Sequence, residues 1–219
     1  MWTRTSNPDQ TRIHHQHQLP LCHSQPEIAT LISIHSPFYQ PHCSACRLPQ
    51  SHCCCEQLAP THWPFEIVLL THASEWQKQH NTGQWLLQHQ DGNIKRIRWQ
   101  RKMPMPELHT GDYLLYPSAD AEIISTSHAA SIKRLWVIDS TWQQANKILR
   151  QTPWLAQLPM LQLANTQSEF TLRRNQQSLC TMESVIGACQ AANVNYAPQA
   201  ALNNFHLLQN AFLSISSRG

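Results

Sequence analysis

The stretch Leu-Trp-Val-Ile-Asp-Ser-Thr-Trp, residues 135–142, decides the fold of this chain. Its apolar beginning is typical of a buried strand, and residues 142–151 after it carry their apolar side chains on one face of a helix. Ser140 or Thr141 is the expected N-cap of that helix. Because α/β sheets place ligands at the carboxyl ends of their strands, we expect Asp139 to belong to a functional site. The structural alternative is a helix cap followed by a core tryptophan.

Other apolar segments continue this alternation of strand and helix. The expected strands are residues 65–70, 112–116, 134–138 and 160–164, and the expected helices are residues 142–151, 181–189 and 199–213. Residues 119–131 are expected to form a short helix or a loop. Strands that alternate with helices indicate a parallel sheet. The sequence therefore predicts an α/β fold with a mostly parallel sheet flanked by helices.

The composition limits the domain count and the compartment. A chain of 219 residues with 41% hydrophobic residues can bury one sizeable core and carry a small appendage. The apolar runs are too short for a transmembrane helix and the N-terminus lacks a signal-peptide core, so we expect a cytoplasmic protein with no membrane partner. The net charge of +3 is small, and an anionic partner must therefore meet a local basic patch.

Three parts of the chain differ in composition. Residues 1–42 are rich in proline and polar side chains, which indicates a flexible N-terminal arm. Residues 43–60 form a cysteine-rich segment, and residues 61–215 have the composition of a folded domain. Disulfides are not expected in the cytoplasm, so the cysteines indicate metal binding or burial.

The cysteine-rich segment has the spacing of a metal site. Cys43 and Cys46 form a C-x2-C pair, and Cys53 and Cys55 form a C-x-C pair. Two such pairs can surround one tetrahedral ion, and Zn²⁺ is the expected ion. An iron-sulfur cluster also accepts four cysteines, and a redox dithiol at the first pair is a further alternative. Four protein ligands leave no open position, so we expect a structural role, with Cys54 pointing away or held in reserve as a ligand.

Residues 94–102 form the densest basic patch in the sequence. The cationic residues are Lys95, Arg96, Arg98, Arg101 and Lys102, with Trp99 among them. Cationic side chains pair with phosphates, and an exposed aromatic ring can stack on an unstacked base. We therefore expect RNA to bind here, and a solvated strand face is the alternative.

The Asp139-x-Thr141-Trp142 motif resembles the signature of the DTW-domain family, whose bacterial members look like tRNA-uridine aminocarboxypropyltransferases. Four further landmarks stand in the family's order and extend the resemblance over residues 43–190. They are the cysteine box, His72-x-x-Glu75 followed by Asn81-Thr82-Gly83, the pair Tyr116-Pro117, and Leu172-Arg173-Arg174 leading to residues 180–183. The chain departs from the family at Gln84, where the family commonly has arginine, and at Cys180 and Ser184.

The resemblance implies a SPOUT-like fold with a trefoil knot near the C-terminus and S-adenosylmethionine bound by three loops. It makes residues 61–215 the catalytic domain. The implied cofactor-binding residues are Tyr116, Pro117, Ser140, Thr141, Trp142, Arg173, Leu179, Thr181 and Glu183. The structural alternative for Glu183 is a favourable charge in the first turn of its helix.

The resemblance also implies a tRNA substrate. The expected substrate-binding residues are His72, Glu75, Asn81, Thr82, Gly83, Lys95, Arg96, Arg98, Arg101 and Arg174. Either Arg173 or Arg174 could hold a carboxylate or a phosphate bidentately. A hydrogen-bonded loop histidine is the alternative for His72.

The implied reaction transfers the 3-amino-3-carboxypropyl group of S-adenosylmethionine to N3 of a tRNA uridine and releases methylthioadenosine. That nitrogen is a poor nucleophile until it loses its proton, so a carboxylate is a suitable general base. Asp139 is the expected base, and its alternative role is to orient the substrate or the cofactor. The alternative functions are a SPOUT-type RNA methyltransferase and a non-catalytic, zinc-stabilised RNA-binding protein.

Overall fold

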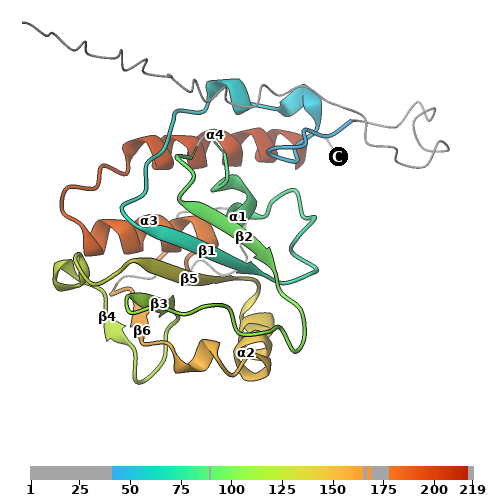
Figure 1. Cartoon of the computed structure of the whole chain (residues 1–219). Helices are drawn as coiled ribbons and strands as arrows, with labels where there is room; N and C mark the ends of the chain where they lie inside the picture. The colour runs from blue at the N-terminus through green and yellow to red at the C-terminus, as the bar shows by residue number, and fades with distance from the viewer. Residues whose placement is uncertain (1–40, 89, 165–166, 169–177, 217–219) are drawn as a thin grey trace, which may run out of the picture.

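The computed structural model describes residues 41–88, 90–164, 167–168 and 178–216 (Figure 1). Nearly all of the predicted N-terminal arm lies outside these residues. Arg173 and Arg174, which were predicted to bind anions, lie outside them as well.

A six-stranded parallel sheet forms the centre of the molecule. Its strands are β1 (Glu66–Thr71), β2 (Ile94–Arg98), β3 (Asp112–Leu115), β4 (Glu122–Ile123), β5 (Arg134–Asp139) and β6 (Met160–Gln162). The strand order is β2-β1-β5-β3-β6-β4, and neighbouring strands pair in parallel throughout. The predicted α/β fold with a mostly parallel sheet is confirmed.

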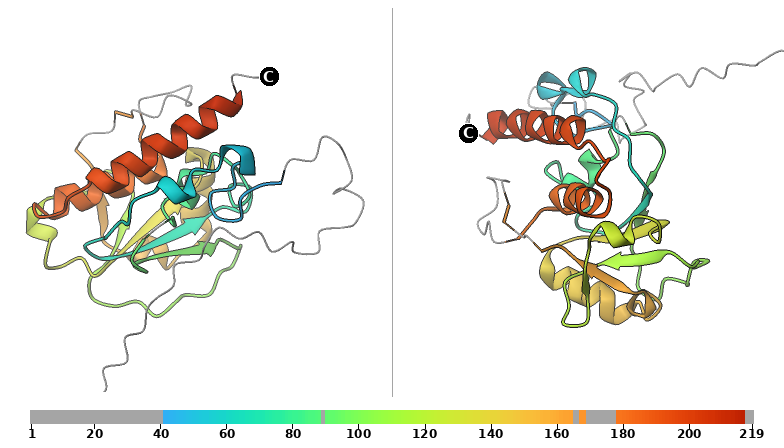
Figure 2. Two further views of the ribbon diagram at one scale, coloured as in Figure 1. Left: turned by 90° about the horizontal axis from the view of Figure 1, so that it is seen from above. Right: turned by 90° about the vertical axis from the view of Figure 1, so that its left-hand side faces the viewer.

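Helices cover both faces of this sheet. They are α1 (Thr82–Trp85), α2 (Trp142–Gln151), α3 (Thr181–Ala192) and α4 (Gln199–Ser216). Helix α2 packs on one face, and α1 and α3 pack on the other, with α4 and the cysteine-rich segment outside α3 (Figures 1 and 2).

Burial on both faces explains the continuous apolar runs in the central strands. In β1, Ile67 and Leu69 belong to the core beneath α3, while Val68 and Leu70 belong to the core beneath α2. Successive side chains of a strand point to opposite faces, so a strand covered on both sides needs apolar residues at every position.

The predicted helix at residues 142–151 is confirmed to the residue as α2. Its N-cap is Thr141, whose hydroxyl accepts a hydrogen bond from the backbone N–H of Gln144 at 3.4 Å. The side chain of Gln144 in turn accepts one from the N–H of Thr141 at 2.9 Å, which completes a capping box. Local signals alone therefore place this helix.

The connection at residues 119–131 contains a strand that the sequence did not indicate. Strand β4 lies at the edge of the sheet and both of its residues are exposed, so it has no apolar pattern. The trefoil knot and the division of the chain at residue 60 stay predictions. Among the described residues, no helix has the length and apolar character needed to cross a membrane.

The boundary between β1 and β5 is the point where the chain changes direction across the sheet. From β1 the chain passes through α1 to β2, which lies on one side of β1. From β5 it passes through α2 to β6, which lies in the opposite direction along the sheet, and α2 packs on the opposite face from α1. Thr71 and Asp139 are register partners at the carboxyl ends of these two strands. Such a switch point opens a crevice, and open α/β sheets bind their ligands there.

Candidate functional site

Asp139 is the centre of a buried polar cluster at this switch point. Its side chain is 2% exposed and accepts hydrogen bonds from four side chains, which with Asp139 are called the Asp139 cluster. The donors are Thr71 Oγ1 at 2.9 Å, Thr181 Oγ1 at 2.8 Å, Asn81 Nδ2 at 3.0 and 3.1 Å, and Arg96 Nη2 at 3.3 Å. The carboxylate thus joins β1, β2, β5, the loop before α1 and the first turn of α3.

This arrangement bears on the role of Asp139. A carboxylate has about four lone-pair sites, and the four donors of the cluster use them. A general base needs a free oxygen within reach of the substrate proton. The described donors use both oxygens of Asp139, so the carboxylate holds together the loops that border the crevice, and its role in the reaction stays a prediction.

The Asn81-Thr82-Gly83 motif packs directly against Asp139. Asn81 donates to the carboxylate and caps α1, because its Oδ1 accepts from the backbone N–H of Gln84 at 2.7 Å. An ideal Cβ on Gly83 would lie 2.6 Å from Cγ of Asp139, so only glycine allows this approach. Asn81 and Gly83 therefore shape the site from within.

Arg96 does not face solvent, and the prediction that it contacts an RNA phosphate is wrong. Its side chain is 3% exposed. The guanidinium donates to Gln84 Oε1 at 2.5 Å and Asn81 Oδ1 at 2.9 Å, and lies 4.4 Å from the ring centre of Trp76. Side chains alternate along β2, and this position points toward α1.

Trp99 was expected to offer an exposed ring for base stacking, and the structure shows otherwise. Its ring is buried, and its Nε1 donates to Thr152 Oγ1 at 2.9 Å. His72 stacks on this ring at 5.7 Å, and burial lowers the pKa of His72. His72 is thus a packed loop histidine that borders neither of the pockets described below.

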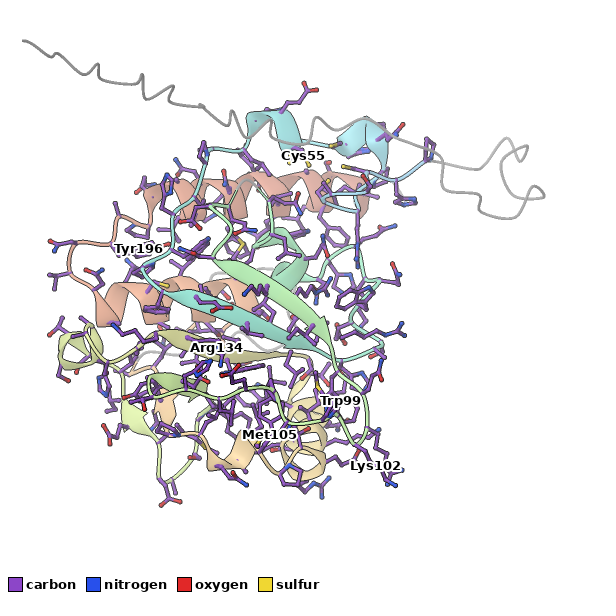
Figure 3. All side chains as sticks on the ribbon, in the orientation of Figure 1. Cys55, Trp99, Lys102, Met105, Arg134 and Tyr196 are labelled. Atoms are coloured by element: carbon purple, nitrogen blue, oxygen red, sulfur yellow. The ribbon has the colours of Figure 1, made fainter. Side chains whose placement is uncertain are left out.

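The remaining cations of the basic patch are exposed. Lys95 pairs with Glu66 at 2.8 Å, whereas Arg98, Arg101 and Lys102 have no ion-pair partner among the described residues. Lys102 lies at the outer rim of the molecule beyond β2 (Figure 3). RNA binding by Lys95, Arg98 and Arg101 stays a prediction.

A pocket of about 420 Å³, here called the loop pocket, lies at the carboxyl edge of the sheet. The resemblance implies that three loops bind the cofactor, after residues 116–117, at residues 139–142 and around residues 179–183, and all three border this pocket. Its lining includes Tyr116, Pro117, Ser140, Trp142, Leu179 and Thr181. The rest of the wall consists of Ser178, Ser184, Gln162, and apolar side chains of β3, β5, β6, α2 and residue 163.

Trp142 is a wall of this pocket and not a core residue. It is 50% exposed and makes an edge contact with the ring of Tyr116 at 6.2 Å. Tyr116 is buried and donates from its hydroxyl to Asn146 Oδ1 at 2.5 Å, and burial raises its pKa. One fixed ring and one exposed ring thus form an aromatic corner.

A second, polar pocket of about 220 Å³ adjoins the first. Ser140 and Thr181 line both pockets. The remaining lining of the polar pocket is Glu75, Lys78, His80, Asn81, Thr82, Asp139, Thr141 and Cys180. Of these, Lys78, His80 and Cys180 were not predicted as site residues. The spacing of Glu75 and Lys78, three positions apart in one turn, is the sequence signal that could have indicated Lys78.

Glu183 has a capping role. Its Oε2 accepts hydrogen bonds from the backbone N–H of Cys180 and from Ser168 Oγ, both at 2.7 Å. It lines neither pocket. The structural alternative for Glu183, an acid in the first turn of α3, matches this position.

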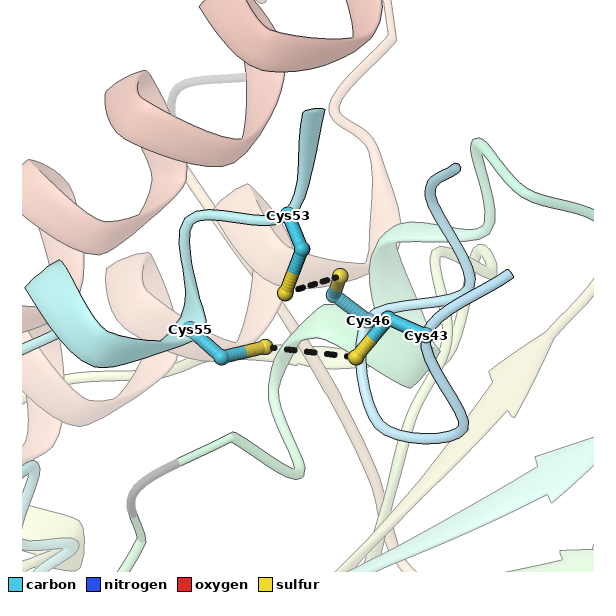
Figure 4. A group of neighbouring side chains, drawn as sticks. All are labelled: Cys43, Cys46, Cys53 and Cys55. Carbon is cyan, nitrogen blue, oxygen red and sulfur yellow. Dashed lines mark hydrogen bonds between the residues drawn. The ribbon is translucent and has the colours of Figure 1, made fainter. Parts of the chain in front are cut away.

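The four predicted cysteine ligands form one cluster. Their sulfur atoms lie within 4.8 Å of one another, and Cys43–Cys55 and Cys46–Cys53 are each 3.8 Å apart (Figure 4). Sulfurs about 2.3 Å from a tetrahedral zinc ion are about 3.8 Å from one another, so the cluster can hold a metal. Cys54 is buried outside it.

The fold and the two adjoining pockets define an α/β protein with a ligand site at the switch point of a parallel sheet. The DTW domain matches residues 40–213, which include the cysteine cluster and both pockets, and the chain belongs to the DTW domain family. This membership supports a function in tRNA modification. No solved structure matches the chain.

Proposed function

We propose that this protein transfers the 3-amino-3-carboxypropyl group of S-adenosylmethionine to N3 of a uridine in tRNA and releases methylthioadenosine. The observation that carries the proposal is the pair of adjoining pockets that share Ser140 and Thr181. A transfer reaction needs two substrates whose reacting atoms meet, and two pockets with a common wall provide that arrangement.

The loop pocket suits the nucleoside part of S-adenosylmethionine. Its volume of about 420 Å³ lies within the range of small-molecule sites, and Trp142 offers an exposed ring on which adenine can stack. No phosphate-binding loop is needed, because this adenosine carries no phosphate. The amino-acid arm would then extend past Ser140 and Thr181 into the polar pocket.

The position of the sulfonium relative to the nucleophile decides whether the methyl group or the aminocarboxypropyl group is transferred. The sulfonium carries three carbon branches, and the bond that breaks is the one held in line with the nucleophile. An amino-acid arm in the polar pocket would place its γ carbon toward a base that enters the same pocket. This arrangement favours aminocarboxypropyl transfer over methyl transfer.

Zinc in the cysteine cluster would have a structural role. Ala45, between two of the cysteines, accepts hydrogen bonds through its carbonyl from Gln84 Nε2 at 2.9 Å and Gln88 Nε2 at 3.0 Å. Gln84 also contacts Arg96 of the Asp139 cluster. A bound ion would thus hold the segment that supports α1 and, through it, the site.

The test is to incubate the full chain with S-adenosylmethionine and an unmodified tRNA transcript and to identify the products by mass spectrometry. We expect methylthioadenosine together with a modified uridine in the tRNA. S-adenosylhomocysteine would instead indicate a methyltransferase. Neither product, with tRNA binding retained, would indicate a binding protein.

A further inference from the structure

Glu75 differs from Asp139 in having a carboxylate oxygen that accepts from no donor among the described residues. Its side chain is 10% exposed and lines the polar pocket. Lys78 Nζ donates to Oε1 at 2.6 Å, and no other described side chain donates to either oxygen. Oε2 is therefore available to a ligand in the pocket, whereas the oxygens of Asp139 are used.

The backbone fixes this position firmly. The turn after β1 is held by the N–H of Glu75, which donates to the carbonyl of His72 at 2.9 Å, and by the N–H of Lys78, which donates to the carbonyl of Glu75 at 3.3 Å. The buried guanidinium of Arg96 also donates to the Glu75 carbonyl, at 3.5 Å. The carboxylate and the ammonium of Lys78 are thus presented together.

This pair complements the edge of a uracil base. The edge presents a carbonyl acceptor, the N3–H donor and a second carbonyl acceptor. A carboxylate oxygen can accept from N3–H, and an ammonium beside it can donate to a neighbouring carbonyl. In cytosine N3 is itself an acceptor and would face the carboxylate without a proton between them, which a desolvated pocket disfavours strongly.

We propose that the polar pocket receives the uracil base and that Glu75 is the catalytic residue that takes the N3 proton. As the proton moves to Oε2, the N3 electron pair forms a bond to the γ carbon of the amino-acid arm. The bond between that carbon and sulfur breaks, and its electrons neutralise the sulfonium to give methylthioadenosine. Glu75 ends as a neutral carboxylic acid and returns its proton to solvent. The inference rests on the proposed function and assigns its base.

The main test compares Glu75→Gln with the wild-type chain in single-turnover assays of methylthioadenosine release. A positioned general base contributes about 10²- to 10⁴-fold, so the variant should be slower by at least about 100-fold while S-adenosylmethionine binding changes by less than about twofold. Without a base, the variant depends on uridines that have already lost their proton. Its rate should therefore rise about tenfold per pH unit below the uridine pKa, more steeply than that of the wild type.

A chemical rescue separates a lost base from a damaged pocket. A transcript made with 5-fluorouridine has more acidic N3 protons, and it should restore much of the rate of Glu75→Gln while changing the wild-type rate little. Glu75→Asp keeps a carboxylate and should retain a rate between the two. Glu107→Gln, at an exposed position remote from both pockets, is the matched control and should behave as the wild type.

The two proposals fail differently. Methylthioadenosine release by Glu75→Gln at a near-normal rate, or a slow variant with the wild-type pH profile and no rescue by 5-fluorouridine, would overturn the role of Glu75 and leave the proposed function standing. A wild-type chain that releases no methylthioadenosine would overturn both.

Discussion

Gly83 and Asp139 lie so close that a methyl group on the glycine would overlap the carboxylate. The ideal Cβ position is 2.6 Å from Cγ and from Oδ2 of Asp139. The first turn of α1, which contains Gly83, and the end of β5 are therefore fitted to each other at the level of single atoms. The Asn-Thr-Gly motif follows from this contact, because Asn81 supplies a donor to the carboxylate and Gly83 supplies the space.

The first prediction concerns this contact. Gly83→Ala should lower the free energy of unfolding by about 1–3 kcal/mol, because the new methyl group must displace the carboxylate of Asp139 or helix α1. Gly187→Ala in α3 is the control, since its Cβ would make ordinary contact with Leu163 at 3.4 Å. Alanine is favoured in a helix, so this control should be neutral or stabilising. Urea denaturation of both variants measures the difference, and equal stabilities would contradict the close approach.

The second prediction concerns the ion pair of Asp139 and Arg96. Asp139→Asn leaves a buried guanidinium without its anion, and the loss of stability should be about 3–5 kcal/mol. Arg96→Met should cost less stability in a chain that already carries Asp139→Asn than it does in the wild type, because the two groups compensate each other. A double-mutant cycle measured by urea denaturation tests this coupling.

The same variant tests the orienting role of Asp139. Turnover of Asp139→Asn should fall on the order of 100-fold or more, because the loops that border both pockets lose their common anchor. Its pH profile should keep the wild-type slope if Asp139 only orients. A slope that becomes as steep as that expected for Glu75→Gln would return the role of base to Asp139.

The third prediction concerns the metal. The purified protein should contain about one zinc ion per chain, held by four thiolates. Replacing Cys43 or Cys55 with serine should lower the zinc content and the melting temperature. Cys54→Ser is the matched control, because this neighbouring cysteine lies outside the cluster. Metal analysis that finds stoichiometric iron, or equal zinc loss in the control, would refute the assignment.

The fourth prediction concerns the exposed part of the basic patch. Replacing Arg98 and Arg101 with glutamine should weaken tRNA binding and reduce its salt dependence by roughly one unit of slope per lost phosphate contact. Lys133→Gln is the control, because Lys133 is an exposed cation just before the amino end of β5, whereas Arg98 lies at the carboxyl end of β2. Arg96 does not belong in this experiment, because its replacement would disturb the Asp139 cluster. Binding measured at several salt concentrations decides the matter, and an unchanged slope would leave these arginines as a solvated surface.

Local sequence signals predicted the strands and helices of the fold well. They predicted poorly how the side chains of Arg96 and Glu75 are oriented in the site. Helix α2 and the strand before it follow from periodicity and a cap, which act within a few residues of one another. Placing Asp139 at the carboxyl edge needed only the end of that strand. The inward orientation of Arg96 could not be seen, because it depends on α1, a helix of four residues with no measurable period. The Glu75 oxygen that has no donor among the described residues could not be seen either, because it depends on where Lys78 lies in space.

The last prediction concerns Trp142, the exposed wall of the loop pocket. Because the indole is 50% exposed, Trp142→Ala should cost only about 1 kcal/mol of stability, mainly the edge contact with Tyr116. If adenine stacks on this ring, the same variant should bind S-adenosylmethionine about tenfold or more weakly, since a stacked base contributes about 1–3 kcal/mol. Trp142→Phe keeps an aromatic face and should recover most of the affinity. Calorimetric titration with S-adenosylmethionine compares the three proteins. Equal affinities would show that the indole does not contact the cofactor, and Leu179 and Pro117 on the other walls of the loop pocket would then be the next positions to test.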